Sequence, residues 1–408
     1  MSSLPNNLFV GSTIGSLKGI NVKRENGVLK VAAKNLIRDK ANLSSQHEIK
    51  TMNWSDEHRD EILIGSKSSV QSFSTINNAL CNSFALPENE CCGIFKSDEK
   101  IFVGITSGSL QSVSTSKNEP EWTVELKMNQ CIERLRRCYV KTNIVATGGK
   151  NNDLKLWDLN TKQITFNAKN VKPDELQLQI PLWISDIAFC QQTESVSTCS
   201  RHGYVRLYDP LLPQRRPVFN AHQDDQVFTC ITCAPAENQF LVGSGTGDLF
   251  LVDVRGKNPF VGKYKSFTGA VKEIICPPRQ SLVFSVSLDR HFRIHDFSTR
   301  KLLLKEYLHT RLTTILPREP FVVEEIETVE SEAEESTEPC IMSDHQTVIK
   351  EEDVKVTDNL FDKMEKIDDG SARKSSLRLK KKLPETDASE DGIETSQKPK
   401  RIKWKKNV

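Results

Sequence analysis

The chain has 408 residues, of which 37% are hydrophobic and 27% are charged, as is typical of folded soluble domains. It has no apolar run near the ~20 residues that a membrane helix needs and no secretory signal at its start, MSSLPNNLFV, so we expect a protein kept inside the cell. The net charge of +2 hides a division: residues 1–318 carry 40 basic and 31 acidic side chains, and residues 319–408 carry 16 and 23.

One pattern recurs along residues 1–318: an apolar stretch that ends in Gly or Ser, a short turn and a second strand. The copy VATGGKNNDLKLWDL, from Val145, alone keeps the dipeptide Trp-Asp, at Trp157 and Asp158. Equivalent positions lie 39 to 54 residues apart, near the ~40–45-residue period of four-stranded propeller blades. In chain order these positions are Gly11, Gly65, Gly104, Gly148, Cys199, Gly243 and Ser285.

Further strands are expected around each copy. An apolar strand precedes it, as in IKTMNW from Ile49, and an outer strand follows, as at 162–168 and 301–307. A ring of such sheets buries faces that one sheet alone would expose, and the apolar spacing of helices is weak throughout. The sequence therefore predicts an all-β, seven-bladed WD-repeat β-propeller over residues 1–318.

Closure of the ring needs a strand from the other end of the domain. The first copy begins at residue 8 with what would be the second strand of a blade, so its innermost strand is missing. The segment TRLTTILP (310–317) is apolar and comes at the end of the predicted ring. We predict that it pairs beside residues 8–12.

Residues 319–408 are expected to form a disordered C-terminal tail. The part 319–370 is acidic and poor in aromatic residues, and two basic clusters follow at 373–382 and 398–406. Such clusters suit nuclear or nucleolar targeting and non-specific RNA binding; the alternative is a tail that only aids solubility. The candidate residues are Arg373, Lys374, Arg378, Lys380, Lys381, Lys382, Lys398, Lys400, Arg401, Lys403, Lys405 and Lys406.

The sequence shows no motif of an enzyme, metal site or cofactor site. GxSxG, HExxH and P-loop patterns are lacking, and GSGTGD (243–248) joins two expected strands instead of a strand and a helix. Cys230 and Cys233 form a lone CxxC whose thiols would point to opposite faces of a strand. We therefore predict a non-enzyme without metal or cofactor.

Two regions are candidates for partner binding. The linker 168–183 is longer than a hairpin turn and mixes cations with apolar residues; the alternative is a loop folded back on its own propeller. The stretch 200–218 is rich in arginine; the alternative is a solvated face. With the turn at residue 150, the candidate residues are Lys150, Asn151, Lys169, Lys172, Asp174, Trp183, Arg201, His202, Arg206, Arg215 and Arg216.

Four other polar or aromatic residues are expected to be structural. Trp157 and Asp158 would close the third strand of a blade. Asp289, in SLDRHFRIHD, would accept backbone N–H bonds in a turn, and His222, in NAHQDD, would play a similar part in a loop.

The stretches 145–159 and 168–189, the segments GSTIGSLKGINV and SLDRHFRIHD, and RRPV at 215–218 resemble the WD-repeat ribosome-assembly factor family. The resemblance runs through most of residues 1–318 in the same order. It implies a non-catalytic scaffold in nucleolar biogenesis of the large (60S) ribosomal subunit and in rRNA processing. The implied partners are pre-60S proteins, an AAA-type ATPase that releases the factor, an exosome-associated RNA helicase and rRNA.

One departure from the general WD-repeat pattern is visible. Other copies end in Tyr208-Asp209, Val252-Asp253 and His295-Asp296 in place of Trp-Asp, which puts the hydrogen-bonded networks of regular repeats in doubt there. A second function is also open, because Asp253 and Arg255 in LVDVR resemble the box of WD-repeat substrate receptors of cullin-type ubiquitin ligases.

Overall fold

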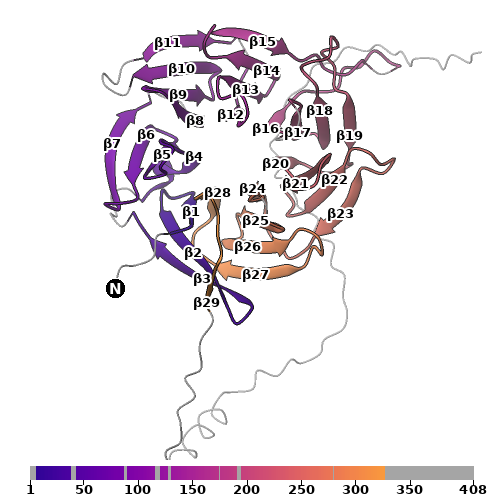
Figure 1. The fold of residues 1–408 in the computed structure, drawn as a ribbon. Coiled ribbons are helices and arrows are strands. Elements are labelled where there is room, and N and C mark those ends of the chain that lie inside the picture. Colours follow the sequence, from indigo (N-terminus) through magenta and orange to yellow (C-terminus); the bar gives the residue numbers. More distant parts are fainter. Residues whose placement is uncertain are drawn as a thin grey trace, which may run out of the picture. The chain divides into compact units, whose positions relative to one another are not determined.

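The computed structural model describes residues 6–37, 43–86, 90–114, 120–126, 130–173, 175–190, 194–278 and 280–326. In this part of the chain the strands form seven small sheets, which are arranged in a ring (Figure 1). Six sheets have four antiparallel strands and one has five strands. The predicted all-β, seven-bladed propeller is therefore confirmed.

The blades are numbered from the N-terminus, and their strands are named from the central channel outward. Blade 1 has β28 (Leu312–Pro317), β1 (Leu8–Ser12), β2 (Leu17–Glu25) and β3 (Val28–Asn35), blade 2 has β4 (Ile49–Trp54), β5 (Glu61–Ser66), β6 (Ser69–Ser74) and β7 (Ala79–Ala85), and blade 3 has β8 (Cys91–Ser97), β9 (Lys100–Ile105), β10 (Ser109–Ser114) and β11 (Pro120–Glu125). The short 3₁₀ helix η2 (Ser45–His47) precedes β4.

The remaining blades repeat this order. Blade 4 has β12 (Arg134–Arg137), β13 (Ile144–Gly149), β14 (Asn152–Asp158) and β15 (Gln163–Asn167), and blade 5 has β16 (Ile184–Phe189), β17 (Val196–Ser200), β18 (Tyr204–Tyr208) and β19 (Phe219–His222). Blade 6 has β20 (Phe228–Cys233), β21 (Gln239–Ser244), β22 (Leu249–Asp253) and β23 (Phe260–Tyr264), and blade 7 has β24 (Val271–Ile275), β25 (Leu282–Ser287), β26 (His291–Asp296) and β27 (Leu302–Tyr307).

The recurrent glycine has a packing reason. A Cβ atom on Gly65 would lie 2.5 Å from Cys91 Sγ in the next blade, and one on Gly243 would lie 2.9 Å from Val271 in the next blade. Such distances are shorter than packed atoms tolerate, so a glycine lets the second strand of one blade approach the innermost strand of the next. The glycine period in the sequence therefore marks the contacts between blades.

Hydroxyl groups add hydrogen bonds between neighbouring blades. Ser185, Thr229 and Thr313 each lie at a register shift, one residue into an innermost strand. Their hydroxyls donate to the first residue of the next innermost strand: Ser185 to the Phe228 carbonyl at 2.7 Å, Thr229 to Val271 at 2.5 Å and Thr313 to Ile49 at 2.6 Å. Buried hydrogen bonds of this kind fix the spacing of the blades.

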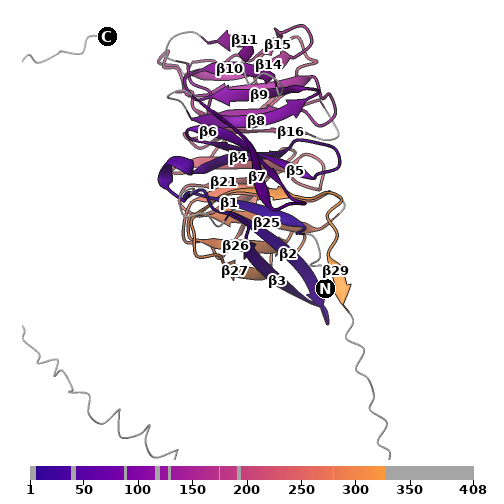
Figure 2. The same cartoon turned by 90° about the vertical axis from the view of Figure 1, so that its left-hand side faces the viewer.

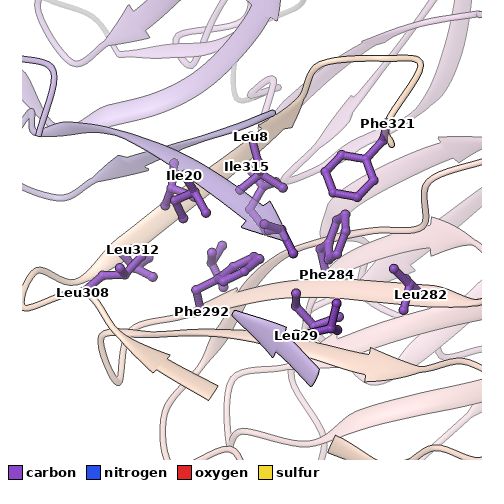
Figure 3. Close-up of a cluster of buried hydrophobic side chains, with 14 residues drawn as sticks. Leu8, Ile20, Leu29, Leu282, Phe284, Phe292, Leu308, Leu312, Ile315 and Phe321 are labelled. Carbon is purple, nitrogen blue, oxygen red and sulfur yellow. The ribbon is translucent and has the colours of Figure 1, made fainter. Parts of the chain in front are cut away.

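The ring closes as predicted. β28 pairs antiparallel with β1, with Leu8 opposite Pro317 and Gly11 opposite Thr314. Figure 3 shows Leu8, Leu312 and Ile315 in one buried cluster between blades 7 and 1. The two ends of the domain are therefore held in one sheet.

The folded part continues past residue 318, where the tail was expected to begin. Phe321 is 6% exposed, and its ring packs edge-on against Phe284 with centroids 4.9 Å apart (Figure 3). Strand β29 (Glu324–Ile326) then pairs parallel with the end of β2, beside the hairpin that β2 forms with β3 (Figures 1 and 2). Residues 319–326 thus extend the closure, and the rest of the expected tail lies outside the described residues.

No helix among the described residues is long and apolar enough to cross a membrane. Cys230 and Cys233 contact opposite neighbours, as expected: the Cys230 thiol lies 3.8 Å from the Val271 carbonyl of blade 7, and the Cys233 thiol lies 3.1 Å from the Phe189 carbonyl of blade 5. In the described ranges, no three His, Cys, Asp or Glu side chains are grouped as metal ligands.

Candidate functional site

Trp183 lies between two hairpin turns of neighbouring blades. It ends the linker from blade 4 to blade 5 and directly precedes β16. Lys150, in the turn between β13 and β14, forms an isolated antiparallel bridge with Trp183. The backbone N–H of Arg201, in the turn between β17 and β18, donates to the Trp183 carbonyl at 3.0 Å. Backbone contacts with both blades therefore fix its position.

Two cations lie against the indole ring. Lys150 Nζ is 4.8 Å from the ring centroid, and Arg201 Cζ is 4.9 Å from it. The indole Nε1 donates to a Glu133 carboxylate oxygen at 3.3 Å, and the other Glu133 oxygen lies 3.9 Å from Arg201. The His202 ring packs edge-on at 6.3 Å. We call Glu133, Lys150, Trp183, Arg201 and His202 the Trp183 patch.

Other charged groups lie near the patch. Burial lowers the pKa of Lys272, on β24, and repulsion from Arg134, Lys50 and Arg201 lowers it further, while Glu48 acts in the opposite direction. Arg134 and Lys50 have carboxylate partners, since Arg134 lies 3.4 Å from Asp186 and Lys50 lies near two glutamates. Among the described residues, no carboxylate lies within ion-pair distance of Lys150, so the patch keeps an uncompensated cation.

Two hydrogen bonds hold the linker: the first closes it into a loop, and the second joins its start to Arg215. Asn170 Nδ2 donates to the Ile180 carbonyl at 2.7 Å, and the Lys169 N–H donates to the Arg215 carbonyl at 2.8 Å. The described residues 170–173 and 175–180 are called the linker loop here, and its exposed residues include Lys172, Leu176 and Leu178, the two leucines being 77% and 62% exposed. Asp174 lies outside the described residues.

Asn151 and the two adjacent arginines of the second cluster take different places. The Asn151 N–H donates to the Leu182 carbonyl at 3.1 Å, which joins its turn to the linker. Arg215 is exposed, and its carbonyl oxygen accepts the hydrogen bond from the Lys169 N–H of the linker. Arg216 is half-buried, and its Nη1 has no hydrogen-bond partner within the described ranges.

Arg206 requires a correction. It was expected at the surface, but only 4% of it is exposed. Its Nε donates to Asn220 Oδ1 at 3.0 Å, and its guanidinium lies 5.1 Å from the Tyr204 ring. The reason is that the third strand of a blade is covered on both faces by neighbours, so an arginine there is buried with partners of its own.

The central channel is crossed by an ion bridge. Arg136 of blade 4 donates to Asp186 of blade 5 at 3.2 Å and to Glu273 of blade 7 at 3.1 Å. Asp186 also accepts the Ile231 N–H of blade 6, and Glu273 accepts the Ile315 N–H of blade 1 at 2.8 Å. Two carboxylates thus converge in the channel, and both are engaged.

In blade 4, Trp157 lies in the interior. The next residue, Asp158, lies at a turn. Trp157 is 5% exposed, and its Nε1 donates to Thr147 Oγ1 at 2.9 Å. Asp158 accepts the Asn160 N–H at 2.9 Å and an amide proton of Asn143 at 3.1 Å. These hydrogen bonds lower the Asp158 pKa.

Asp289 holds a buried arginine. Arg293 is 0% exposed and donates to Asp289, while its guanidinium lies 4.7 Å from the Phe267 ring. Asp289 also accepts the N–H groups of His291 and Thr268 at 3.1 and 3.2 Å. Burial raises the pKa of Asp289, but hydrogen bonds from Arg293 and Ser287 outweigh it, so the pKa lies well below its ordinary value.

The remaining residues singled out by the sequence are spread over other parts of the chain. His222 stacks on Tyr204 at 4.3 Å, and its Nε2 lies 3.1 Å from the His202 carbonyl. Asp253 and Arg255 pair with each other at 2.6 Å, so this turn is closed on itself. The basic tail residues, from Arg373 to Lys406, lie outside the described residues.

The structure adds two residues to the candidate site that the sequence reasoning missed. Glu133 and Lys272 lie on or beside the innermost strands of blades 4 and 7 and reach the same region as Trp183. Strand positions alone could have suggested them, because Glu133 comes directly before β12 and Lys272 is the second residue of β24. A separate cavity of about 360 Å³ lies between blades 3 and 4, and none of its lining residues belongs to the Trp183 patch.

The chain is similar in sequence to several known proteins. The chain is 33% identical over 319 residues to WD repeat-containing protein 74 of Bos taurus, which covers 76% of this chain and 80% of that protein. It is 31% identical over 320 residues to the Homo sapiens protein of the same name, with the same coverage of both chains. It is also 29% identical over 268 residues to ribosome biogenesis protein NSA1 of Meyerozyma guilliermondii, which covers 55% of this chain and 65% of that protein.

No family model matches the chain. Among solved structures, the computationally designed Ika8 protein is similar with a TM-score of 0.55 and 15% identity, covering 76% of this chain and 87% of that one, which supports the fold alone. Fold and repeats together define a WD-repeat β-propeller. Within that class, the chain belongs to the WD-repeat ribosome-assembly factor family, together with WD repeat-containing protein 74.

Proposed function

We propose that this protein is a non-catalytic assembly factor in the biogenesis of the large (60S) ribosomal subunit and in rRNA processing. The observation that carries the proposal is family membership: relatives named ribosome biogenesis protein NSA1 match 55% and 58% of the chain. A propeller suits such a role, because rigid strands present many loops on one surface.

The docking surface in this proposal is the Trp183 patch with the linker loop. It combines a fixed tryptophan and an exposed arginine, two residue types that are enriched in protein interfaces, with an exposed lysine and exposed leucines. The candidate partners are proteins of the pre-60S particle and rRNA, with release by an AAA-type ATPase and contact with an exosome-associated RNA helicase. Residues 327–408 would act as a separate tail that directs the protein to the nucleus and nucleolus.

The channel supports a role without catalysis. A general base needs a carboxylate or imidazole free to take a proton from substrate. The two channel carboxylates, Asp186 and Glu273, instead share Arg136 and accept backbone N–H groups. The self-paired Asp253 and Arg255 likewise give no specific support to the ligase-receptor alternative.

The test is sedimentation of tagged protein from cell extract on a sucrose gradient, with probes for precursors of large-subunit rRNA. Full-length protein is expected in the precursor fractions, and its depletion should lower the amount of large subunits. The double substitution Lys150→Glu with Arg201→Glu should move protein to the top of the gradient, and Arg215→Glu tests the second cluster. Sedimentation away from the precursors, with normal large subunits after depletion, would exclude the proposal.

A further inference from the structure

The Trp183 patch has more cationic than anionic groups at its open surface. Lys150 is exposed and has no carboxylate within ion-pair distance in the described part of the chain, and Arg201, whose side chain is 44% exposed, has only the 3.9 Å contact with Glu133. Lys272 adds a third charge close by. An anionic group that approaches Lys150 and Arg201 would gain two charge-assisted hydrogen bonds without displacing a strong ion pair.

The aromatic ring is not arranged as a platform for nucleic-acid bases. Stacking of a base needs an open ring face, but here the cations of Lys150 and Arg201 already lie 4.8 and 4.9 Å from the ring centroid. These contacts favour a carboxylate over an RNA strand.

Apolar residues continue the patch along the chain. The linker loop that leads into Trp183 carries Leu176 and Leu178, both largely exposed. The Asn170–Ile180 hydrogen bond closes this loop, so its leucines are presented from a short, constrained segment. Exposed leucines beside cations suit a partner that combines apolar and acidic side chains.

We propose that the Trp183 patch and the linker loop bind an acidic, leucine-type segment of a partner protein, with its carboxylates at Lys150 and Arg201 and its apolar side chains at Leu176 and Leu178. This inference rests on the proposed function only for the identity of the partner. The binding chemistry stands on the contacts within the patch.

The first experiment selects displayed random 16-residue peptides on immobilised full-length protein. Counter-selection on the K150E/R201E protein removes peptides that bind elsewhere, including those that bind the basic tail, because the tail is the same in both proteins. Selected peptides are expected to be enriched in Asp and Glu together with Leu, Ile or Phe. Failure to enrich such peptides above the counter-selection would overturn the proposal.

The second experiment measures the affinity of a selected, fluorescein-labelled peptide by anisotropy. K150E/R201E should weaken binding at least tenfold, and L176S/L178S should weaken it about fivefold. The matched control K257E/K301E carries the same change of charge on loops of blades 6 and 7 and should leave affinity within twofold. Thermal unfolding of each variant checks that the fold is kept.

Two further probes separate other occupants. The first probe is a 12-nucleotide single-stranded uridine RNA. If it binds the protein and its affinity falls tenfold in K150E/R201E, the patch is a nucleic-acid surface instead. A peptide of residues 327–338, which has six glutamates and no basic residue, tests the chain's own acidic segment; binding as tight as that of the selected peptides would make the occupant internal. Normal sedimentation with pre-ribosomes beside a failed peptide selection would reject this inference and leave the proposed function standing.

Discussion

Single side chains in this propeller do not follow one WD-repeat formula. Trp157 makes a buried hydrogen bond to Thr147. In blade 7, His295 stands at the corresponding position, and a separate pair, Asp289 in the turn and Arg293 in the third strand, is buried beside it. Arg293 is completely buried, and a buried cation without its anion is strongly unfavourable. Asp289 is thus a structural anion whose charge the blade needs.

The Asp289 carboxylate should therefore make stability depend on pH. Its pKa is lower in the folded state than the ~3.9 of an unfolded aspartate, so its contribution is fully present above that value and is lost as pH falls through the folded pKa. The free energy of unfolding, from urea titrations, should fall by about 1–2 kcal/mol more between pH 5 and pH 3 in the wild type than in Asp289→Asn.

The free energy of unfolding of Asp289→Asn should be about 3 kcal/mol lower than that of the wild type at pH 7, because Arg293 is left without its anion. Equal pH dependence in the two proteins would show that Asp289 is not the titrating group.

At the scale of strands, the sequence predicted the elements that recur in the blades but missed strand β29, which has no counterpart in the other blades. Gly65 and Gly243 recur because each faces the next blade, and the apolar segment 310–317 predicted the closing strand. Strand β29 follows no repeat, and its residues Glu324–Ile326 resemble the acidic stretch behind them. Arg206 was misplaced because charge suggests exposure, and only the packing of neighbouring blades shows that both faces of β18 are covered.

The closing strands lead to a prediction about truncation. A chain that stops after Ile326 keeps β28, Phe321 and β29, so its melting temperature should stay within about 2 °C of the full-length value. A chain that stops after His309 loses β28 and exposes Leu8 and the cluster around it, so cooperative unfolding should disappear. Calorimetry of both proteins tests this; a normal transition in the shorter chain would contradict the role given to β28.

At the scale of the whole molecule, net charge has opposite signs in the propeller region and in the remainder of the chain. The propeller region up to residue 318 has a net charge of +9, and the remainder has a net charge of −7 although it ends in basic clusters. In the proposed function, docking belongs to the first of these parts and targeting to the second. Sequence alone predicted this division from composition, but it could not show which of the surface cations come together, since Lys150, Trp183 and Arg201 meet only in the folded ring.

Separation of these tasks predicts the behaviour of the isolated propeller. A fluorescent fusion of residues 1–326 should lose its accumulation in nucleoli, because the clusters at 373–382 and 398–406 are removed, while its melting temperature is kept. Fluorescence microscopy measures the nucleolar-to-cytoplasmic ratio, and a fusion of residues 327–408 alone should regain it. Unchanged accumulation of the 1–326 fusion would show that the propeller carries its own targeting signal.

The pairing of β1 with β28 also has a consequence for the order of events during synthesis. Strand β1 is synthesised about 300 residues before β28, the strand with which it pairs. The edge of β1 therefore stays unpaired, and prone to wrong pairing, while the residues between them are translated. Because 91 residues follow Pro317, the last strand of the ring is not the last part of the chain to be made. The nascent propeller can therefore close while its tail is still being translated.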